Sequence, residues 1–282
     1  MQIHALFLLV YFVCLILINT GEKMRKLLIA ISFFTRIPIK IKDVTSEEFY
    51  DSMILIPIVG LFIGLILYGV SVLVSLIHFI DLQALLMMII YIWLTGGLHL
   101  DGFADTTDAL FSARDREKMM EIMKDSRLGA FGAIGLILLI MTYWMSFTVV
   151  LPKYSIVLLI MPVFGRVAAI MSTCFSTYAP GGGGLGKRFV EMTKLHHFVI
   201  YSVSLLVFAT VILGYAGFIA VVLSFIPGLL LMLNLQKKIG GMTGDTIGMT
   251  IELNQVFFLV IFSVMIINFP TSMLLIPGTF FG

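Results

Sequence analysis

Long apolar stretches alternate with short polar segments along this chain. Seven stretches are almost continuously apolar, namely Met53–Ile80, Leu82–Leu94, Leu128–Leu151, Ser155–Ser176, Phe198–Leu213, Tyr215–Leu235 and Gln255–Phe269. Most of them are long enough to cross a hydrocarbon core of about 30 Å as helices. Because backbone polar groups must be satisfied inside a bilayer, the pattern predicts an all-α, polytopic integral membrane helical bundle with about seven transmembrane helices.

Two further apolar segments precede these seven. The first, His4–Ile18, has the length of a signal peptide but lacks a basic start and a small-residue cleavage site. The shorter segment Leu27–Ile37 predicts an interfacial or re-entrant element. Because Arg-Lys follows Met24, Met24 is an alternative start. We therefore expect residues 1–23 to be an N-terminal apolar extension or an extra anchor, and residues 24–282 to form a single membrane-embedded catalytic domain.

The composition excludes a soluble globular enzyme and a disordered chain, since 60% of the residues are hydrophobic and 12% are charged. A net charge of +2 gives no reason to expect a nucleic-acid partner. When the spans are threaded alternately, four polar loops on one side hold 16 of the 18 lysines and arginines. The positive-inside rule therefore predicts a multi-pass protein of the cell membrane, in contact with the lipid bilayer, with its active face in the cytoplasm.

Three carboxylates between the second and third spans form the richest candidate site. Around a helix, Asp105 lies about 40° from Asp101 and Asp108 lies about 20° to the other side, so all three face one way. Like charges on one stripe repel, so the pattern favours a divalent cation such as Mg²⁺, which binds few carboxylates and completes its shell with substrate phosphates. The alternative is a solvated acidic face near a helix N-terminus.

Cationic residues accompany the carboxylates. Lys124 and Arg127 are three residues apart and are candidates for binding a diphosphate, with Asp125 as a further metal ligand. Arg166 lies inside an apolar span, where an arginine is by default a functional candidate, with a phosphate or the aspartates as its partner. Topology anchoring of the first two and structural pairing of Arg166 are the alternatives.

Two glycine-rich loops complete the set of candidates. The first, with Gly184, Gly186 and Lys187, lacks the Ser or Thr that follows the lysine in a P-loop, which excludes an ATPase, but its free N–H groups suit phosphate binding. The second contains Thr243 and Asp245, and Asp245 is a candidate for completing the metal site. A flexible linker and a helix N-cap at Asp245 are the alternatives.

The chain resembles the cobalamin synthase family, also described as adenosylcobinamide-GDP ribazoletransferase or cobalamin-5′-phosphate synthase. Motifs with the family's order and approximate spacing carry the resemblance, and they are Ser32-Phe-Phe-Thr-Arg-Ile-Pro38, Leu98-His-Leu-Asp-Gly-Phe-Ala-Asp-Thr-Thr-Asp108, Met123-Lys-Asp-Ser-Arg127, Gly165-Arg166, Gly184-Leu-Gly186 and Gly240-Gly-Met-Thr-Gly-Asp245. They cover the chain from about Met24 to the last span. Ala109 and Ala113 stand where the family tends to have glycine.

The resemblance implies a Mg²⁺-dependent transfer. α-Ribazole, or its 5′-phosphate, would attack adenosylcobinamide-GDP, release GMP and form adenosylcobalamin or its 5′-phosphate. Asp101, Asp105, Asp108 and Asp245 would be catalytic and hold metal with Asp125, whereas Lys124, Arg127, Arg166 and the two glycine loops would bind substrate. The sequence does not determine whether the chain forms a homo-oligomer.

Other readings of the residues remain. A membrane CDP-alcohol phosphotransferase and an aromatic prenyltransferase both place spaced aspartates beside helix ends, although neither pattern fits as well. A transporter is a further alternative, which the gathering of polar residues on one side makes less attractive.

Overall fold

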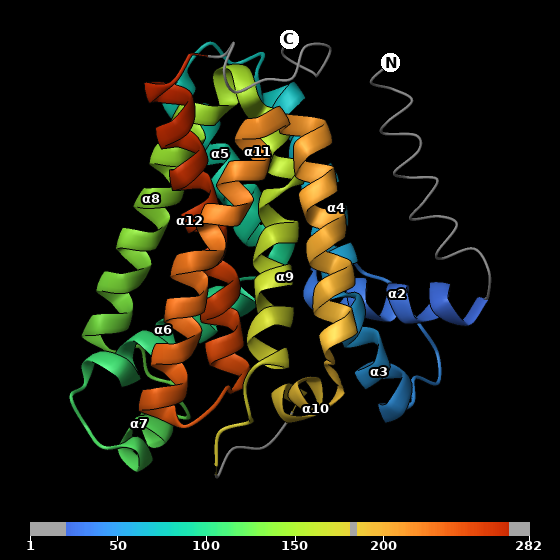
Figure 1. Ribbon diagram of the computed structural model, residues 1–282, viewed down its shortest axis with the longest axis vertical. Coiled ribbons are helices and arrows are strands. Elements are labelled where there is room, and N and C mark those ends of the chain that lie inside the picture. The colour runs from blue at the N-terminus through green and yellow to red at the C-terminus, as the bar shows by residue number, and fades with distance from the viewer. Residues whose placement is uncertain (1–20, 181–184, 271–282) are drawn as a thin grey trace.

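The predicted all-α fold is confirmed by a computed structural model that describes residues 21–180 and 185–270 (Figure 1). Within these ranges the chain forms helices and, apart from one isolated bridge between Tyr178 and Met242, no β-structure. The apolar segment predicted near the N-terminus lies outside the described residues.

Long helices run side by side and form the body of the bundle (Figure 1). They are α4 (Ile56–Val74), α5 (Ile80–Thr95), α8 (Ala130–Tyr154), α9 (Met161–Cys174), α11 (Leu195–Ile239) and α12 (Gly244–Asn268). In the described part of the chain, four helical stretches are long and apolar enough to cross a membrane, or five when α5 is joined to α6 (Leu98–Phe111). The chain is therefore a multi-pass membrane protein.

Helix α11 contains two antiparallel halves. Gly214, with φ 66° and ψ −152°, interrupts its helical backbone. The rings of Phe198 and Phe225 are 6.2 Å apart, whereas 27 residues of continuous helix would separate them by about 40 Å. The two halves match the predicted stretches on either side of Gly214. When they are counted separately, each of the seven predicted apolar stretches corresponds to a helix, although α9 is shorter than a membrane span.

Shorter elements lie around one end of the bundle (Figure 1). They are α2 (Gly21–Phe34), α3 (Ser46–Ser52), η1 (Met53–Leu55), α7 (Arg116–Ile122) and α10 (Leu185–Met192), while η2 (Ser155–Leu159) joins α8 to α9. Helix α2 lies crosswise to the long helices and is tied to α3 by the ion pairs Arg25–Glu48 and Lys26–Asp51, at 2.8 and 3.0 Å. This orientation fits the predicted interfacial element.

Helix α6 is positioned by a sharp turn and a close crossing. Gly96 and Gly97 both have left-handed backbones, and α6 runs at 92° to α5, so it lies across the end of the bundle instead of along it. A Cβ atom on Gly102 would lie 2.8 Å from the Asp245 Cα, and one on Gly248 would lie 3.2 Å from the His99 carbonyl oxygen. The backbones of α6 and α12 therefore meet without side chains between them.

The start predicted for the last span was wrong. Helix α12 begins at Gly244, where the Thr243 hydroxyl accepts a hydrogen bond from the Thr246 N–H at 3.2 Å, so Thr243 is the N-cap and Asp245 lies in the first turn. Glu252, which precedes the predicted start of this span at Gln255, is fully buried inside the bundle. Hydropathy failed here because polar side chains that face other helices lower the apolar average without ending the helix.

The close crossing makes Gly102 intolerant of a side chain. We expect Gly102→Ala to lower the free energy of unfolding by about 1–3 kcal/mol, because the added methyl group meets the backbone of Asp245. Thermal unfolding in detergent measures this change. Gly69→Ala is the matched control, since its Cβ would have nothing within 4 Å. Equal stability of the two variants would contradict the crossing.

Candidate functional site

The three aspartates of α6 have different surroundings, although they were predicted to share one stripe. Asp101 is exposed, Asp105 is half-buried and Asp108 is 8% exposed. The exposure of the aspartates falls along α6 towards Asp108, which is bonded to the start of α8. The structure therefore separates residues that the helical spacing alone treated as equivalent.

Asp108 is held at the N-terminus of α8. Its two carboxylate oxygens accept hydrogen bonds from the backbone N–H groups of Gly129 and Gly132, both at 2.8 Å. A Cβ atom on either glycine would collide with this carboxylate, so a side chain at either position would displace Asp108 from these bonds. The positive end of a helix stabilises a carboxylate, so this position favours the charge of Asp108. The two bonds join α6 to α8 and engage both carboxylate oxygens.

Asp101, Asp105 and Asp245 form the acidic cluster, in which α6 and α12 each place carboxylates at the crossing. Burial, together with the negative charges of Asp101, Asp245 and Asp108, raises the pKa of Asp105 to about 6. The cluster thus brings together residues that are far apart in the sequence. A site that accumulates negative charge in this way favours a bound cation.

The acidic cluster fits Mg²⁺ better than a metal that needs a full set of protein ligands. Within the described residues, no three His, Cys, Asp or Glu side chains come close enough to hold one ion. Mg²⁺, however, usually takes one or two carboxylates and fills its other positions with water and substrate phosphates. Two of the three carboxylates in the cluster suffice for such a site.

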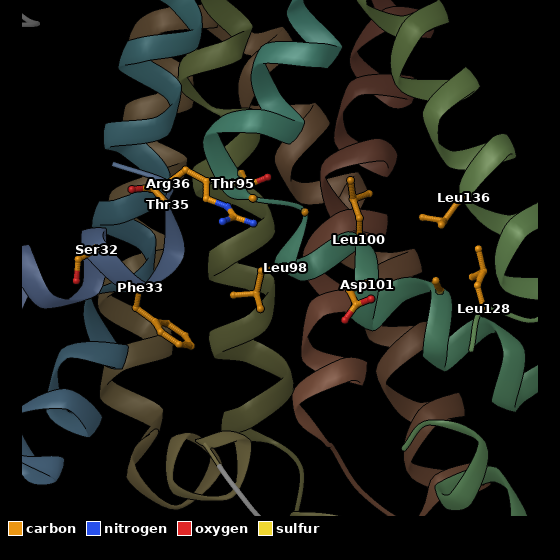
Figure 2. A pocket seen from close by; sticks show the side chains of 13 residues that line it. Ser32, Phe33, Thr35, Arg36, Thr95, Leu98, Leu100, Asp101, Leu128 and Leu136 are labelled. Atoms are coloured by element: carbon orange, nitrogen blue, oxygen red, sulfur yellow. The ribbon is translucent and has the colours of Figure 1, made fainter. Parts of the chain in front are cut away.

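A cavity of about 650 Å³ opens beside the acidic cluster, between α2, the α5–α6 turn and α8 (Figure 2). Two of the described lining residues are charged, Arg36 and Asp101, and the others include Thr95, Leu128 and Leu136. Figure 2 shows Arg36 and Asp101 on either side of Leu98, and no ion pair joins them among the described residues. The cavity therefore offers separate positive and negative groups within a wall of mixed polar and apolar residues.

Arg36 was not among the substrate-binding residues predicted from the sequence. Its backbone N–H donates to the Leu94 carbonyl oxygen at 2.8 Å, and its Nε lies 2.6 Å from where a Cβ of Gly96 would be. Its guanidinium makes no hydrogen bond with the described residues. The motif that begins at Ser32 contained this arginine, but only the fold shows that it faces the aspartate segment.

The segment between α7 and α8 differs from the prediction. Arg127 donates to the Asp125 carboxylate at 2.6 Å, and the guanidinium holds the pKa of Asp125 at about 2. The predicted metal ligand Asp125 is therefore paired with the predicted diphosphate ligand. Arg127 is exposed and precedes Leu128 of the cavity wall, and Lys124 is exposed on the same segment.

Arg166 is far more enclosed than expected for a substrate ligand. It is 0% exposed, is absent from the described lining of the cavity, and donates to the carbonyl oxygen of Pro162 and the side-chain oxygen of Gln255, both at 3.0 Å. Among the described residues these hydrogen bonds go to α9 itself and to α12, and none goes to the predicted aspartates.

Gly186 of the first glycine-rich segment lies against the N-terminus of α12, next to the second. A Cβ on Gly186 would lie 2.8 Å from the Gly244 backbone nitrogen, so α10 packs directly on the first turn that carries Asp245. Lys187 is exposed on α10, and the Thr243 side chain is buried as a helix cap. Gly184 lies outside the described residues.

Comparison with known proteins places this geometry in a family. The family model described as CobS, cobalamin-5-phosphate synthase, matches residues 26–263. The adenosylcobinamide-GDP ribazoletransferase of Clostridium acetobutylicum is 39% identical over 240 residues, which cover 83% of this chain and 94% of that protein. The proteins of the same name from Alkaliphilus oremlandii and Acetivibrio thermocellus are 36% and 34% identical, covering 84% and 85% of this chain and 96% and 97% of their own lengths.

No solved structure matches the chain. The family match nevertheless includes most of α2, Arg36 after it, the aspartates of α6 and the first turn of α12, which build the site. Since the match covers well over half of the chain and the relatives exceed 30% identity along nearly their whole length, the chain belongs to the cobalamin-5-phosphate synthase family.

Proposed function

We propose that the chain transfers α-ribazole, or its 5′-phosphate, to adenosylcobinamide-GDP and releases GMP. One observation carries the proposal: in a member of this family, the acidic cluster lies beside a cavity that contains the Arg36 guanidinium. Displacement at a diphosphate requires this pairing of cation-binding carboxylates with a fixed positive group. The product is adenosylcobalamin or its 5′-phosphate.

Mg²⁺ is the cofactor that the acidic cluster suits. Two of the three carboxylates Asp101, Asp105 and Asp245 would hold it together with water and substrate phosphates, whereas Asp108 is engaged by two backbone N–H groups. When bound, Mg²⁺ neutralises phosphate oxygens and so favours departure of the leaving group. The raised pKa of Asp105 supports this assignment, because a cation relieves the repulsion that raises it.

The residues of the chain account for the rest of the reaction. The ribose hydroxyl oxygen of ribazole bonds to the cobinamide-linked phosphorus while the bond from that phosphorus to the bridging oxygen breaks, and GMP leaves with that oxygen. Asp245, half-buried at the crossing, accepts the hydroxyl proton. Arg36 holds the diphosphate in the cavity, and exposed Lys124 and Lys187 attract it from solvent.

The active face is cytoplasmic in this proposal. The acidic cluster lies at the end of the bundle that carries α7 and α10, where Arg116, Lys187 and Lys237 also lie. An excess of Lys and Arg marks the cytoplasmic side of membrane proteins. Water-soluble nucleotide substrates would therefore reach the site without crossing the bilayer.

The assay that tests the function combines adenosylcobinamide-GDP, α-ribazole and Mg²⁺ with the membrane fraction. We expect GMP and a new corrinoid product, followed by mass spectrometry, and loss of both with EDTA. Asp105→Asn should lower turnover at least about 100-fold, since it removes a charged metal ligand. Normal turnover of folded Asp105→Asn would refute the metal assignment, and absence of product from metal-replete wild type would refute the substrates.

Arg36 generates a separate prediction about binding. We expect Arg36→Gln to raise the KM for adenosylcobinamide-GDP about 10–100-fold, because a charged hydrogen bond to phosphate contributes about 1.5–3 kcal/mol. Steady-state kinetics measure the change. Lys40→Gln removes an exposed positive charge outside the described cavity lining and is the control. Similar KM values for the two variants would show that Arg36 does not hold the diphosphate.

The pKa of Asp105 sets the sign of a pH effect on metal-free protein. Its folded-state pKa of about 6 exceeds the ordinary value of 3.8, so the folded chain retains a proton that the unfolded chain releases between these values. We therefore expect the thermal stability of EDTA-treated protein to increase as the pH falls from about 7 to about 5. The increase should be smaller in Asp105→Asn, and equal slopes for both proteins would contradict the assignment.

A further inference from the structure

Five polar side chains form a second cluster, the buried network, in the interior of the bundle and outside the described cavity lining. They are Tyr91 of α5, Tyr143 of α8, Arg166 of α9, and Glu252 and Gln255 of α12, and each is 0% exposed. Charged side chains in such a setting need partners, because an unpaired buried charge is strongly destabilising. The network therefore has to be explained as a unit.

Hydrogen bonds join the network in one chain of partners. Tyr91 donates its hydroxyl proton to one Glu252 oxygen at 2.7 Å, and Tyr143 donates to the other at 2.8 Å. The Gln255 Nε2 donates to both tyrosine oxygens, at 2.7 and 2.9 Å. Arg166 Nη1 donates to the Gln255 Oε1 at 3.0 Å. Four helices are thereby connected through two residues of α12.

The directions of these bonds are mutually consistent. An arginine can only donate, so the Gln255 amide must present its oxygen to Arg166 and its nitrogen to the tyrosines. Each hydroxyl then accepts from Gln255 and donates to Glu252, whose two oxygens act as acceptors, as in an ionised carboxylate. The negative charge of Glu252 and the positive charge of Arg166 compensate each other through Gln255 and the tyrosines.

Glycines fit the backbones closely around the network. A Cβ on Gly60 would lie 2.7 Å from the Arg166 Cδ, and one on Gly165 would lie 2.6 Å from the Gln255 Cγ. The Arg166 Nε and Nη2 have no hydrogen-bond partner among the described residues. Gln255, the Pro162 carbonyl oxygen and the charge of Glu252 are therefore the interactions that stabilise this guanidinium.

We propose that Arg166 is a positioning residue, which fixes the rotation of α12 by compensating Glu252 across the buried network. Glu252 follows Asp245 by seven residues, so the two lie about 20° apart around α12 and about 10 Å apart along it. Locking the face that carries Glu252 therefore directs Asp245 towards α6. The effect on catalysis rests on the proposed function, in which Asp245 acts, and in this proposal Arg166 does not touch the diphosphate.

Charge-removing variants separate this role from diphosphate binding. Arg166→Gln, Glu252→Gln and the double variant are compared with wild type for the yield of folded protein, thermal stability in detergent, kcat and the KM for adenosylcobinamide-GDP. Lys153→Gln removes an exposed positive charge near the end of α8 and is the control. Tyr91→Phe, which removes one donor to Glu252 and keeps the ring, is a milder fifth variant.

The positioning role predicts compensation. Arg166→Gln leaves a buried carboxylate without its counter-charge, so stability and kcat should fall, with kcat about 10-fold or more below wild type. The double variant should recover at least about 3-fold of the lost kcat or folded yield, because neither charge is left alone. KM in the double variant and in Tyr91→Phe should stay within about 3-fold of wild type.

Different results would overturn the inference. A double variant no more stable and no more active than Arg166→Gln would exclude charge compensation. A KM about 10-fold or more higher in the double variant, with its stability restored, would identify Arg166 as a diphosphate ligand. If wild type forms no product, the proposed function fails, but folded yield and thermal stability still decide whether Arg166 and Glu252 compensate each other.

Discussion

The crossing of α6 and α12 is the constraint on which the site depends. Gly102 allows the backbone of α6 to contact Asp245, and Gly248 allows α12 to approach His99 in return. Without side chains between them, the two helices bring carboxylates that are more than 130 residues apart into one cluster. Gly96 and Gly97, whose backbones are left-handed, also contribute to the crossing, because they allow α6 to turn away from the direction of α5 and lie across the bundle.

Gathering like charges opposes folding, and the structure limits that opposition in two ways. Asp108 is drawn out of the acidic cluster by the N–H groups at the start of α8, where the helix dipole stabilises its charge. Asp101 remains exposed, so water screens its charge. Asp105 is partly buried beside like charges, which raises its pKa. The unfavourable repulsion is thus confined to the place where a cation and a diphosphate would relieve it.

The two arginines of interest illustrate how burial separates binding from support. Arg36 is exposed at a cavity, and its guanidinium has no hydrogen-bond partner among the described residues. Arg166 is enclosed by α4, α9 and α12 and is bonded to Gln255. A guanidinium can bind phosphate only where phosphate can enter, so accessibility distinguishes the two more reliably than charge does. The buried network also explains why α12 tolerates Glu252 and Gln255 in an apolar bundle.

The sequence by itself determined the membrane bundle, the break of α11 at Gly214, the helical aspartate segment and the family resemblance, because apolar periodicity and local motifs record these features directly. It did not reveal the start of α12, the engagement of Asp108 by α8, the pairing of Asp125 with Arg127, or the position of Arg36 at the cavity. Asp108 and Arg36 depend on partners that are distant along the chain, whereas the start of α12 and the Asp125–Arg127 pair depend on local geometry that hydropathy does not record. Only the tertiary structure decides which polar groups face one another, since hydropathy and spacing describe a helix without its neighbours.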